Sequence, residues 1–245
     1  MTTITNAYTN ALLADATYAL KLNGLENKTG GDLTKLLTDR MTPTLAKYIG
    51  DNFTVVTHIE TDDTLTSGFD ATVWKENATG KIYLSLQGTT GLQDFLTDVS
   101  LAFTGNAGQQ VIDMANWWLK ITTPVGQMAR QIGHTVDAVS GLVSAANDVP
   151  GAGLVSAADL AQGIEVNGHS LGGYLATAFT RLFGSEAHVS HTSTFNGAGF
   201  ALGSESAFKN LQNLIGPGYG LGRFPNGSEQ SNYFAVNDAN FRSVA

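Results

Sequence analysis

Cysteine is absent from the sequence, and so are the usual signs of membrane insertion. Without cysteine the chain forms no disulfide, no thiolate metal site and no cysteine nucleophile, so a covalent catalyst has to be a serine or a threonine. Residues 1–6 lack the basic and apolar regions of a signal peptide, and no uncharged apolar run is long enough to cross a bilayer. We therefore expect a soluble chain.

Basic residues are few and scattered. The chain has 13 Lys and Arg against 21 Asp and Glu, which gives a formal net charge of -8. This charge repels nucleic-acid phosphates and anionic headgroups, so we expect no nucleic-acid partner. The compartment stays open. Acidic chains without cysteine or signal peptide also occur among bacterial proteins secreted through a C-terminal signal, although the glycine-aspartate repeats of such proteins are absent here.

The first half of the sequence predicts a strand-rich front section between helices. Apolar spacing indicates a helix over 7–22, and a short helix is expected from Pro43 to residue 48. From 94 to about 148 the pattern again indicates helix, with breaks at Gly105 and Pro124. Strands rich in Val, Ile, Thr and aromatic residues are expected at 53–59, 69–75 and 81–86, with a hairpin turn at 77–80.

The second half alternates strands with helices. These elements are a strand at 164–167, a helix at 171–183, a strand at 189–195, a helix at 206–214 and a strand at 233–236. Residues 216–231 are dense in Gly and Pro and are expected to form a loop. The alternation predicts the α/β class, with a mostly parallel sheet wrapped by helices, and the length favours a single domain over residues 1–245.

The strongest motif is GHSLGG at residues 168–173, a G-x-S-x-G that follows a predicted strand and precedes a predicted helix. A strand that turns abruptly into a helix strains the serine backbone and leaves no room for side chains at Gly168 and Gly172. This turn would expose the Ser170 hydroxyl and aim the Leu171 amide at a developing oxyanion. The alternative is a glycine-rich turn with no catalytic role.

This motif resembles the nucleophile elbow of α/β-hydrolase lipases, namely the class 3 lipases and the bacterial true lipases exported by type I secretion. The resemblance extends to LSLQGTT at 84–90 and DFLTD at 94–98, which are similar to the family's strand ending in F-R-G-T/S and its D-W-L-x-D continuation. It implies that the Thr89 amide is the second oxyanion donor and that Asp98 braces the loop. Gln87 departs from the family's Arg, and a plain turn at a strand end is the alternative.

The triad of such enzymes continues with an acid and then a histidine. Asp238 lies in VNDANFR after the last predicted strand, a stretch that resembles the surroundings of the catalytic aspartate in the type I secreted lipases. In the fungal-type pattern the acid would fall at Asn240, so we favour the bacterial branch, with Asp238 as the acid. A surface-turn aspartate is the alternative.

No histidine follows Asp238. His169 belongs to the elbow and is expected to point away from the attacking side of Ser170. The others either carry no motif or flank the strand at 189–195, and they are His58, His134, His188 and His191. We therefore expect the catalytic histidine to lie beyond residue 245, so that the sequence is a C-terminally incomplete domain.

No metal and no other cofactor is expected. The resemblance places Thr90 and Asp98 near two calcium-ligand positions of the bacterial branch, but Ala102 stands where a further carboxylate is expected. Trp117 and Trp118 follow the predicted oxyanion loop, and two interpretations stay open for them: a mobile cover over an acyl pocket or a core helix.

Two functional hypotheses follow from these residues. The first is a serine carboxylic ester hydrolase that cleaves lipid esters through an acyl-enzyme on Ser170, as a triacylglycerol lipase or phospholipase-like enzyme working at a lipid-water interface. The second is a catalytically inactive α/β-hydrolase fold that serves as a binding module. The ester class follows from the resemblance, because the same elbow also serves thioesterases, peptidases and acyltransferases.

Overall fold

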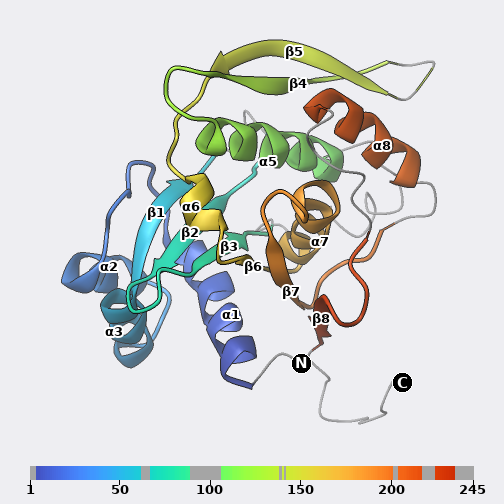
Figure 1. Cartoon of the computed structure of the whole chain (residues 1–245). Coiled ribbons are helices and arrows are strands. Elements are labelled where there is room, and N and C mark those ends of the chain that lie inside the picture. Colours follow the sequence, from blue (N-terminus) through green and yellow to red (C-terminus); the bar gives the residue numbers. More distant parts are fainter. Residues whose placement is uncertain are drawn as a thin grey trace.

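A six-stranded sheet forms the centre of the molecule in the computed structural model (Figure 1), which describes residues 4–61, 67–88, 106–137, 140, 142–200, 204–216 and 224–234. The antiparallel front strands are β1 (Phe53–Ile59), β2 (Ala71–Glu76) and β3 (Ile82–Leu86). The strands that continue in parallel from β3 are β6 (Ile164–His169), β7 (Val189–Phe195) and β8 (Gln230–Tyr233). The predicted α/β class and the strand-rich front section are confirmed.

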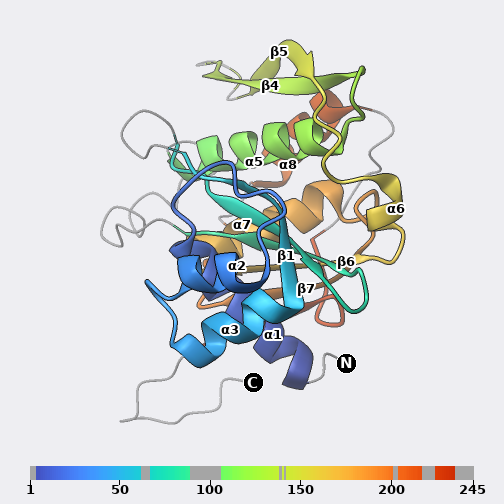
Figure 2. The ribbon, with the colours of Figure 1, turned by 90° about the vertical axis from the view of Figure 1, so that its left-hand side faces the viewer.

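The inner strands β3 and β6 bury side chains on both faces of the sheet because successive residues point to opposite sides. On one face, Ile82, Leu84 and Leu86 of β3 join the core formed with α5 (Asn106–Thr122) and α7 (Leu171–Phe183). On the other face, Tyr83 joins a second core with the N-terminal helices. Figure 2 shows this layering, with the sheet between α7 and the helices α1 to α3.

The N-terminal helices cover the second face of the sheet. They are α1 (Ile4–Ala16), the 3-10 turn η1 (Thr17–Ala19), α2 (Gly30–Leu37) and α3 (Pro43–Asn52). The predicted helix at 7–22 thus becomes a helix followed by a tighter turn, and α2 was not predicted. None of the described helices has the length and apolar content to cross a bilayer.

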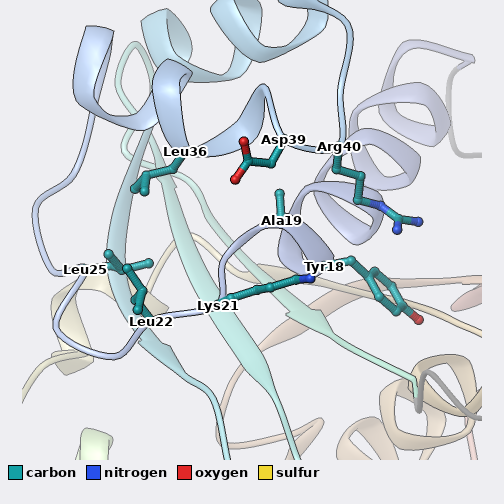
Figure 3. Close-up of a pocket in the computed structure, with 8 residues that line it drawn as sticks. All are labelled: Tyr18, Ala19, Lys21, Leu22, Leu25, Leu36, Asp39 and Arg40. Carbon is teal, nitrogen blue, oxygen red and sulfur yellow. The ribbon is translucent and has the colours of Figure 1, made fainter.

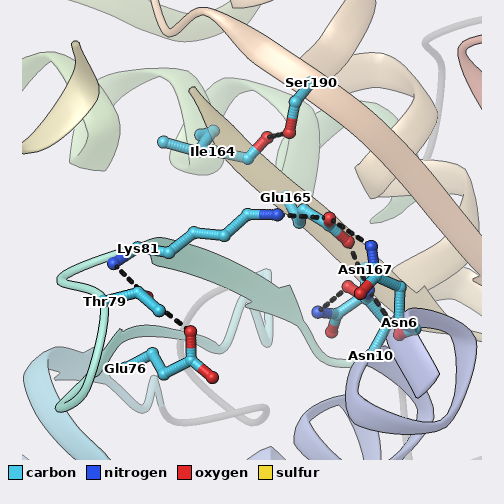
Figure 4. A network of polar contacts seen from close by, with 9 residues as sticks. All are labelled: Asn6, Asn10, Glu76, Thr79, Lys81, Ile164, Glu165, Asn167 and Ser190. Atoms are coloured by element: carbon cyan, nitrogen blue, oxygen red, sulfur yellow. Dashed lines mark hydrogen bonds and ion pairs between the residues drawn. The ribbon is translucent and has the colours of Figure 1, made fainter. Parts of the chain in front are cut away.

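A buried polar network attaches α1 to the sheet (Figure 4). Glu165 of β6 is 3% exposed and pairs with Lys81 Nζ at 2.5 Å and with Asn10 Nδ2 at 2.5 Å. Asn10 in turn accepts a hydrogen bond of 2.9 Å from Asn167, two residues further along β6. A buried carboxylate needs such partners, so this network fixes where α1 sits on the sheet.

The expectation of helix from residue 94 to about 148 is wrong in its second half. Helix α5 ends at Thr122, and the chain turns at Gly126, whose φ is +88°. It then forms an antiparallel hairpin of β4 (Met128–Val136) and β5 (Val143–Pro150) that lies over α5 in Figure 1. The side-chain amide of Asn116 on α5 pairs with both backbone groups of Ile132, at 2.9 and 2.7 Å, and so anchors the hairpin.

The remaining predicted elements differ from the structure only at their ends. Helix α7 and strand β7 have the predicted bounds, and α8 (Ser204–Ile215) extends the predicted helix at both ends. The last strand is displaced, because β8 covers Gln230–Tyr233 rather than 233–236 and so begins inside the predicted loop. The short helix α6 (Ala157–Leu160), held by a capping box between Ser156 and Asp159, was not predicted.

Burial of His58 makes the fold sensitive to acid. His58 of β1 is 4% exposed, its Nδ1 lies 2.8 Å from Thr72 Oγ1, and desolvation lowers its pKa from 6.5 to about 4. The unfolded chain therefore takes up this proton below about pH 6.5, whereas the folded chain resists it down to about pH 4. Stability that is present above pH 6.5 is lost as the pH falls through this window.

We predict that the free energy of unfolding falls by about 2 kcal/mol more between pH 7.5 and 5 in the parent chain than in His58→Gln, because glutamine has no proton to gain. Urea unfolding at the two pH values measures this difference. Other titrating groups contribute equally to both proteins and cancel in the comparison. Identical pH dependence of parent and variant would contradict the assignment.

Candidate active site

Ser170 stands at an abrupt turn between β6 and α7. Its φ of 58° and ψ of -125° lie in a region that residues with side chains rarely adopt, at a cost of about 1–3 kcal/mol. Its N–H donates to the carbonyl of Phe195 at 2.9 Å, and its carbonyl accepts from the Gly173 N–H at 2.9 Å. The surrounding backbone therefore holds the strained serine in place.

The glycines of GHSLGG allow this turn because backbone approaches backbone there. A Cβ atom on Gly168 would overlap the carbonyl of Gly172, and one on Gly172 would overlap the carbonyl oxygen of Leu86. A Cβ on Gly173 would lie 2.7 Å from the Cα of Gly197. A mostly parallel sheet between helices, with a strained serine between strand and helix, is the architecture of an α/β-hydrolase.

The Leu171 amide opens α7, in the first turn, where backbone N–H groups have no acceptor inside the helix. The end of β3 comes directly against it, since a Cβ on Gly88 would lie 3.1 Å from Leu171 N and 2.7 Å from the His169 carbonyl oxygen. The backbone at Gly88 therefore passes directly beside the backbone of His169 and Leu171. Thr89 follows and lies outside the described residues, so its role as second oxyanion donor stays a prediction.

Tyr18 was missed by the sequence analysis, although its hydroxyl lies between β3 and the elbow. The Gly88 N–H donates to Tyr18 Oη at 2.9 Å, and Tyr18 Oη donates to the His169 carbonyl at 3.4 Å. Tyr18 also lines a pocket of about 250 Å³ together with Lys21 and Arg40 (Figure 3). No motif surrounds this tyrosine, so its position could be found only from the fold.

No hydrogen bond joins a histidine to Ser170 among the described residues. The His169 ring lies beside Tyr18, with Nδ1 3.5 Å from Tyr18 Oη, and partial burial lowers its pKa. His191 Nε2 is 3.0 Å from Ser231 Oγ. His134 Nε2 is 2.6 Å from a carboxylate oxygen of Asp113.

The two histidines around β7 lie toward the beginning of that strand. The carbonyl of His188 accepts from the first amide of β6, Ile164 N–H, at 3.1 Å, whereas Ser170 follows the last residue of β6. Both His188 and His191 therefore lie near the end of the β6–β7 pair that is opposite to the elbow.

Several predicted site residues lie outside the described part of the chain. They are Thr90, Asp98, Ala102 and Asp238, and their suggested roles stay predictions. Within the described residues, no group of three His, Asp or Glu side chains has an arrangement that could hold a metal ion.

Trp117 and Trp118 belong to the core, which decides between the two interpretations of this pair. Trp118 is 2% exposed, and its ring meets that of Phe179 on α7 edge-on with the centroids 4.8 Å apart. Trp117 packs in the same way on Phe69, at 5.8 Å. These side chains therefore fix α5 to α7 and to the segment before β2, and they do not act as a mobile cover.

An apolar recess opens beyond the end of β7. Its volume is about 320 Å³. The apolar part of its walls consists of Phe200, Phe224, Phe234 and residues 197–199, and the polar part consists of Thr177, Thr194, Gln230 and Asn232. Phe234 is 64% exposed at its rim. The recess lies next to the elbow because Gly197 touches Gly173, in the first turn of α7.

We predict that Gly172→Ala lowers the free energy of unfolding by about 3 kcal/mol or more, because the new methyl group forces α7 away from Leu86 of β3. The matched control is Gly31→Ala, since nothing lies within 4 Å of a Cβ built there and the site is inside helix α2. The control should be neutral or stabilising by up to about 1 kcal/mol. Urea unfolding measures both, and equal effects would contradict the close approach.

No protein-family model matches the sequence, and no curated protein matches it either. Solved structures of a lipase from Yarrowia lipolytica show partial similarity. The nonglycosylated LIP2 lipase aligns with a TM-score of 0.41 at 17% identity, over 77% of this chain and 57% of that one. A 1.7 Å crystal structure of Lip2 lipase aligns with a TM-score of 0.42 at 15% identity, over 92% of this chain and 68% of that one. This chain thus spans less than two thirds of the nonglycosylated LIP2 chain.

Proposed function

We propose that this protein is a serine ester hydrolase with Ser170 as its nucleophile. The observation that carries the proposal is the strained Ser170 between β6 and α7, with the first amide of α7 beside it. In the reaction, Ser170 Oγ attacks the ester carbonyl carbon while a general base takes its proton. The Leu171 and Thr89 amides stabilise the oxyanion, the alcohol leaves, and water releases the acid from the acyl-enzyme.

Asp238 completes the proposed site as the acid that orients the catalytic histidine. A histidine base is needed because the serine hydroxyl is a weak nucleophile at neutral pH. The five histidines up to His191 provide no hydrogen bond to Ser170 in the described structure.

Lipid esters are the proposed substrate class. The resemblance of residues 84–98 and 168–173 to lipases supports this class, and so does the apolar recess next to the elbow. Its three phenylalanine rings would bury an acyl chain, and each buried methylene contributes about 0.8 kcal/mol to binding. Hydrolysis at a lipid-water interface is part of the same proposal.

We predict that a fluorophosphonate probe labels Ser170 of the full-length protein, because the Oγ–P bond forms as fluoride leaves and the developing charge falls on the oxyanion donors. Mass spectrometry of peptides locates the label. Ser170→Ala should abolish labelling, whereas Ser228→Ala, a change at an exposed surface turn, should leave it unchanged. Labelling at another serine, or none at all, would contradict the proposed nucleophile and favour a binding module.

Acyl-chain preference tests the recess. We predict that kcat/KM for p-nitrophenyl octanoate exceeds that for the acetate, and that Gly199→Phe lowers the octanoate value about 10-fold or more while the acetate value stays within about 2-fold. Gly199 lines the recess, and a Cβ there meets nothing within 4 Å. Gly227→Phe is the control, because that glycine is equally open but outside the recess. Equal effects on both esters would place the acyl chain elsewhere.

A further inference from the structure

We propose that Tyr18 is a positioning residue for the oxyanion donors, and that its hydroxyl sets the distance between the end of β3 and the elbow. This inference rests on the proposed function. Tyr18 touches neither the reacting atoms nor a substrate in this scheme. It acts through Gly88, which precedes the predicted donor Thr89, and through His169, which precedes the nucleophile.

Beyond the last pair of β3 and β6, the Tyr18 hydroxyl replaces a neighbouring strand as the acceptor for a backbone amide. β3 pairs with β6 only up to Leu86 and Gly168, and the next amide, Gln87 N–H, donates to the Asp70 carbonyl at 3.0 Å. The following amide, Gly88 N–H, has Tyr18 Oη as its acceptor at 2.9 Å. A buried amide without an acceptor is costly, so this bond decides where the chain leaves the sheet.

The same oxygen also faces the elbow. It lies 3.4 Å from the His169 carbonyl oxygen and 3.5 Å from His169 Nδ1. One hydroxyl therefore contacts the residue before Thr89 on one side and the residue before Ser170 on the other. The two segments that supply the proposed oxyanion donors are joined through a single oxygen atom.

The tyrosine ring is itself held in place. The Arg40 guanidinium lies 4.8 Å from the ring centroid, and Asp15 holds that guanidinium at 2.7 Å (Figure 3 shows Tyr18 and Arg40). Burial raises the pKa of Tyr18, so the hydroxyl keeps its proton and can donate to the elbow while it accepts from Gly88. Tyr18 belongs to η1, which continues directly from α1, and the bond between Asn10 and Glu165 attaches α1 to the sheet. The position of the Tyr18 hydroxyl therefore also depends on the position of α1.

We predict that Tyr18→Phe slows fluorophosphonate labelling of Ser170 about 10-fold at saturating probe, with little change in the probe concentration that gives half-saturation. The ring and its contact with Arg40 stay, but Gly88 loses its acceptor and is no longer joined to the elbow through the Tyr18 hydroxyl. Amide hydrogen exchange should also become faster at Gly88. Tyr48→Phe, which removes an exposed hydroxyl from α3, should change neither measurement.

A second variant separates positioning from loss of stability. Leu33→Ala opens a cavity in the N-terminal core but keeps the Tyr18 hydroxyl and its contact with Arg40, so it should lower the melting temperature and leave the labelling rate within about 2-fold. If the full-length parent protein is labelled and Tyr18→Phe is labelled equally fast, the positioning role is overturned and the proposed function stands. If the parent protein is not labelled, the proposed function is overturned and this inference falls with it.

Discussion

Direct contact between backbones at the carboxyl ends of β3, β6 and β7 is the constraint on which the site depends. Gly172 lies against the Leu86 carbonyl, and Gly173 lies against Gly197. No side chain separates these segments, so α7 can begin immediately after β6 and Ser170 has to adopt a positive φ of 58°. Contacts in the rest of the fold compensate for this backbone strain, because an isolated turn would relax to an unstrained conformation.

Apolar packing on one face of the sheet provides much of this compensation. Ile164 and Val166 of β6 are fully buried under α7, and the aromatic contact between Trp118 and Phe179 locks α5 against the same helix. Outside α5, the β4–β5 hairpin provides a further layer, which explains why α5 is apolar on more than one side. The elbow helix is therefore held between a sheet and a covered helix and cannot shift to relieve the serine.

The elements with a strong periodic pattern were predictable from the sequence, and those defined by tertiary contacts were not. Helix α7 and strand β7 have the predicted bounds, since an apolar pattern before Gly184 marks the helix and β-branched residues ending in Phe195 mark the strand. The β4–β5 hairpin was predicted as helix. The contact that anchors it joins Asn116 to the backbone of Ile132, 16 positions away, and such a contact produces no recognisable pattern in the local sequence. Tyr18 was missed for the same reason, since its partners Gly88 and His169 are about 70 and 151 positions away.

The polar row on β6 has a positional role rather than a stabilising one. Glu165, Asn167 and His169 alternate with the apolar residues of the strand and face α1 and the turn after it. An apolar row of the same size would pack at least as well, since a buried ion pair seldom stabilises more than apolar side chains of similar volume. A polar row, however, favours one position of α1, because Asn6 and Asn10 both donate to the Glu165 carboxylate, at 3.4 and 2.5 Å, and a shift along the helix axis would break at least one of these bonds. That position of α1 also fixes the turn that carries Tyr18, so the geometry beside Ser170 depends on a charge buried five residues earlier, in β6.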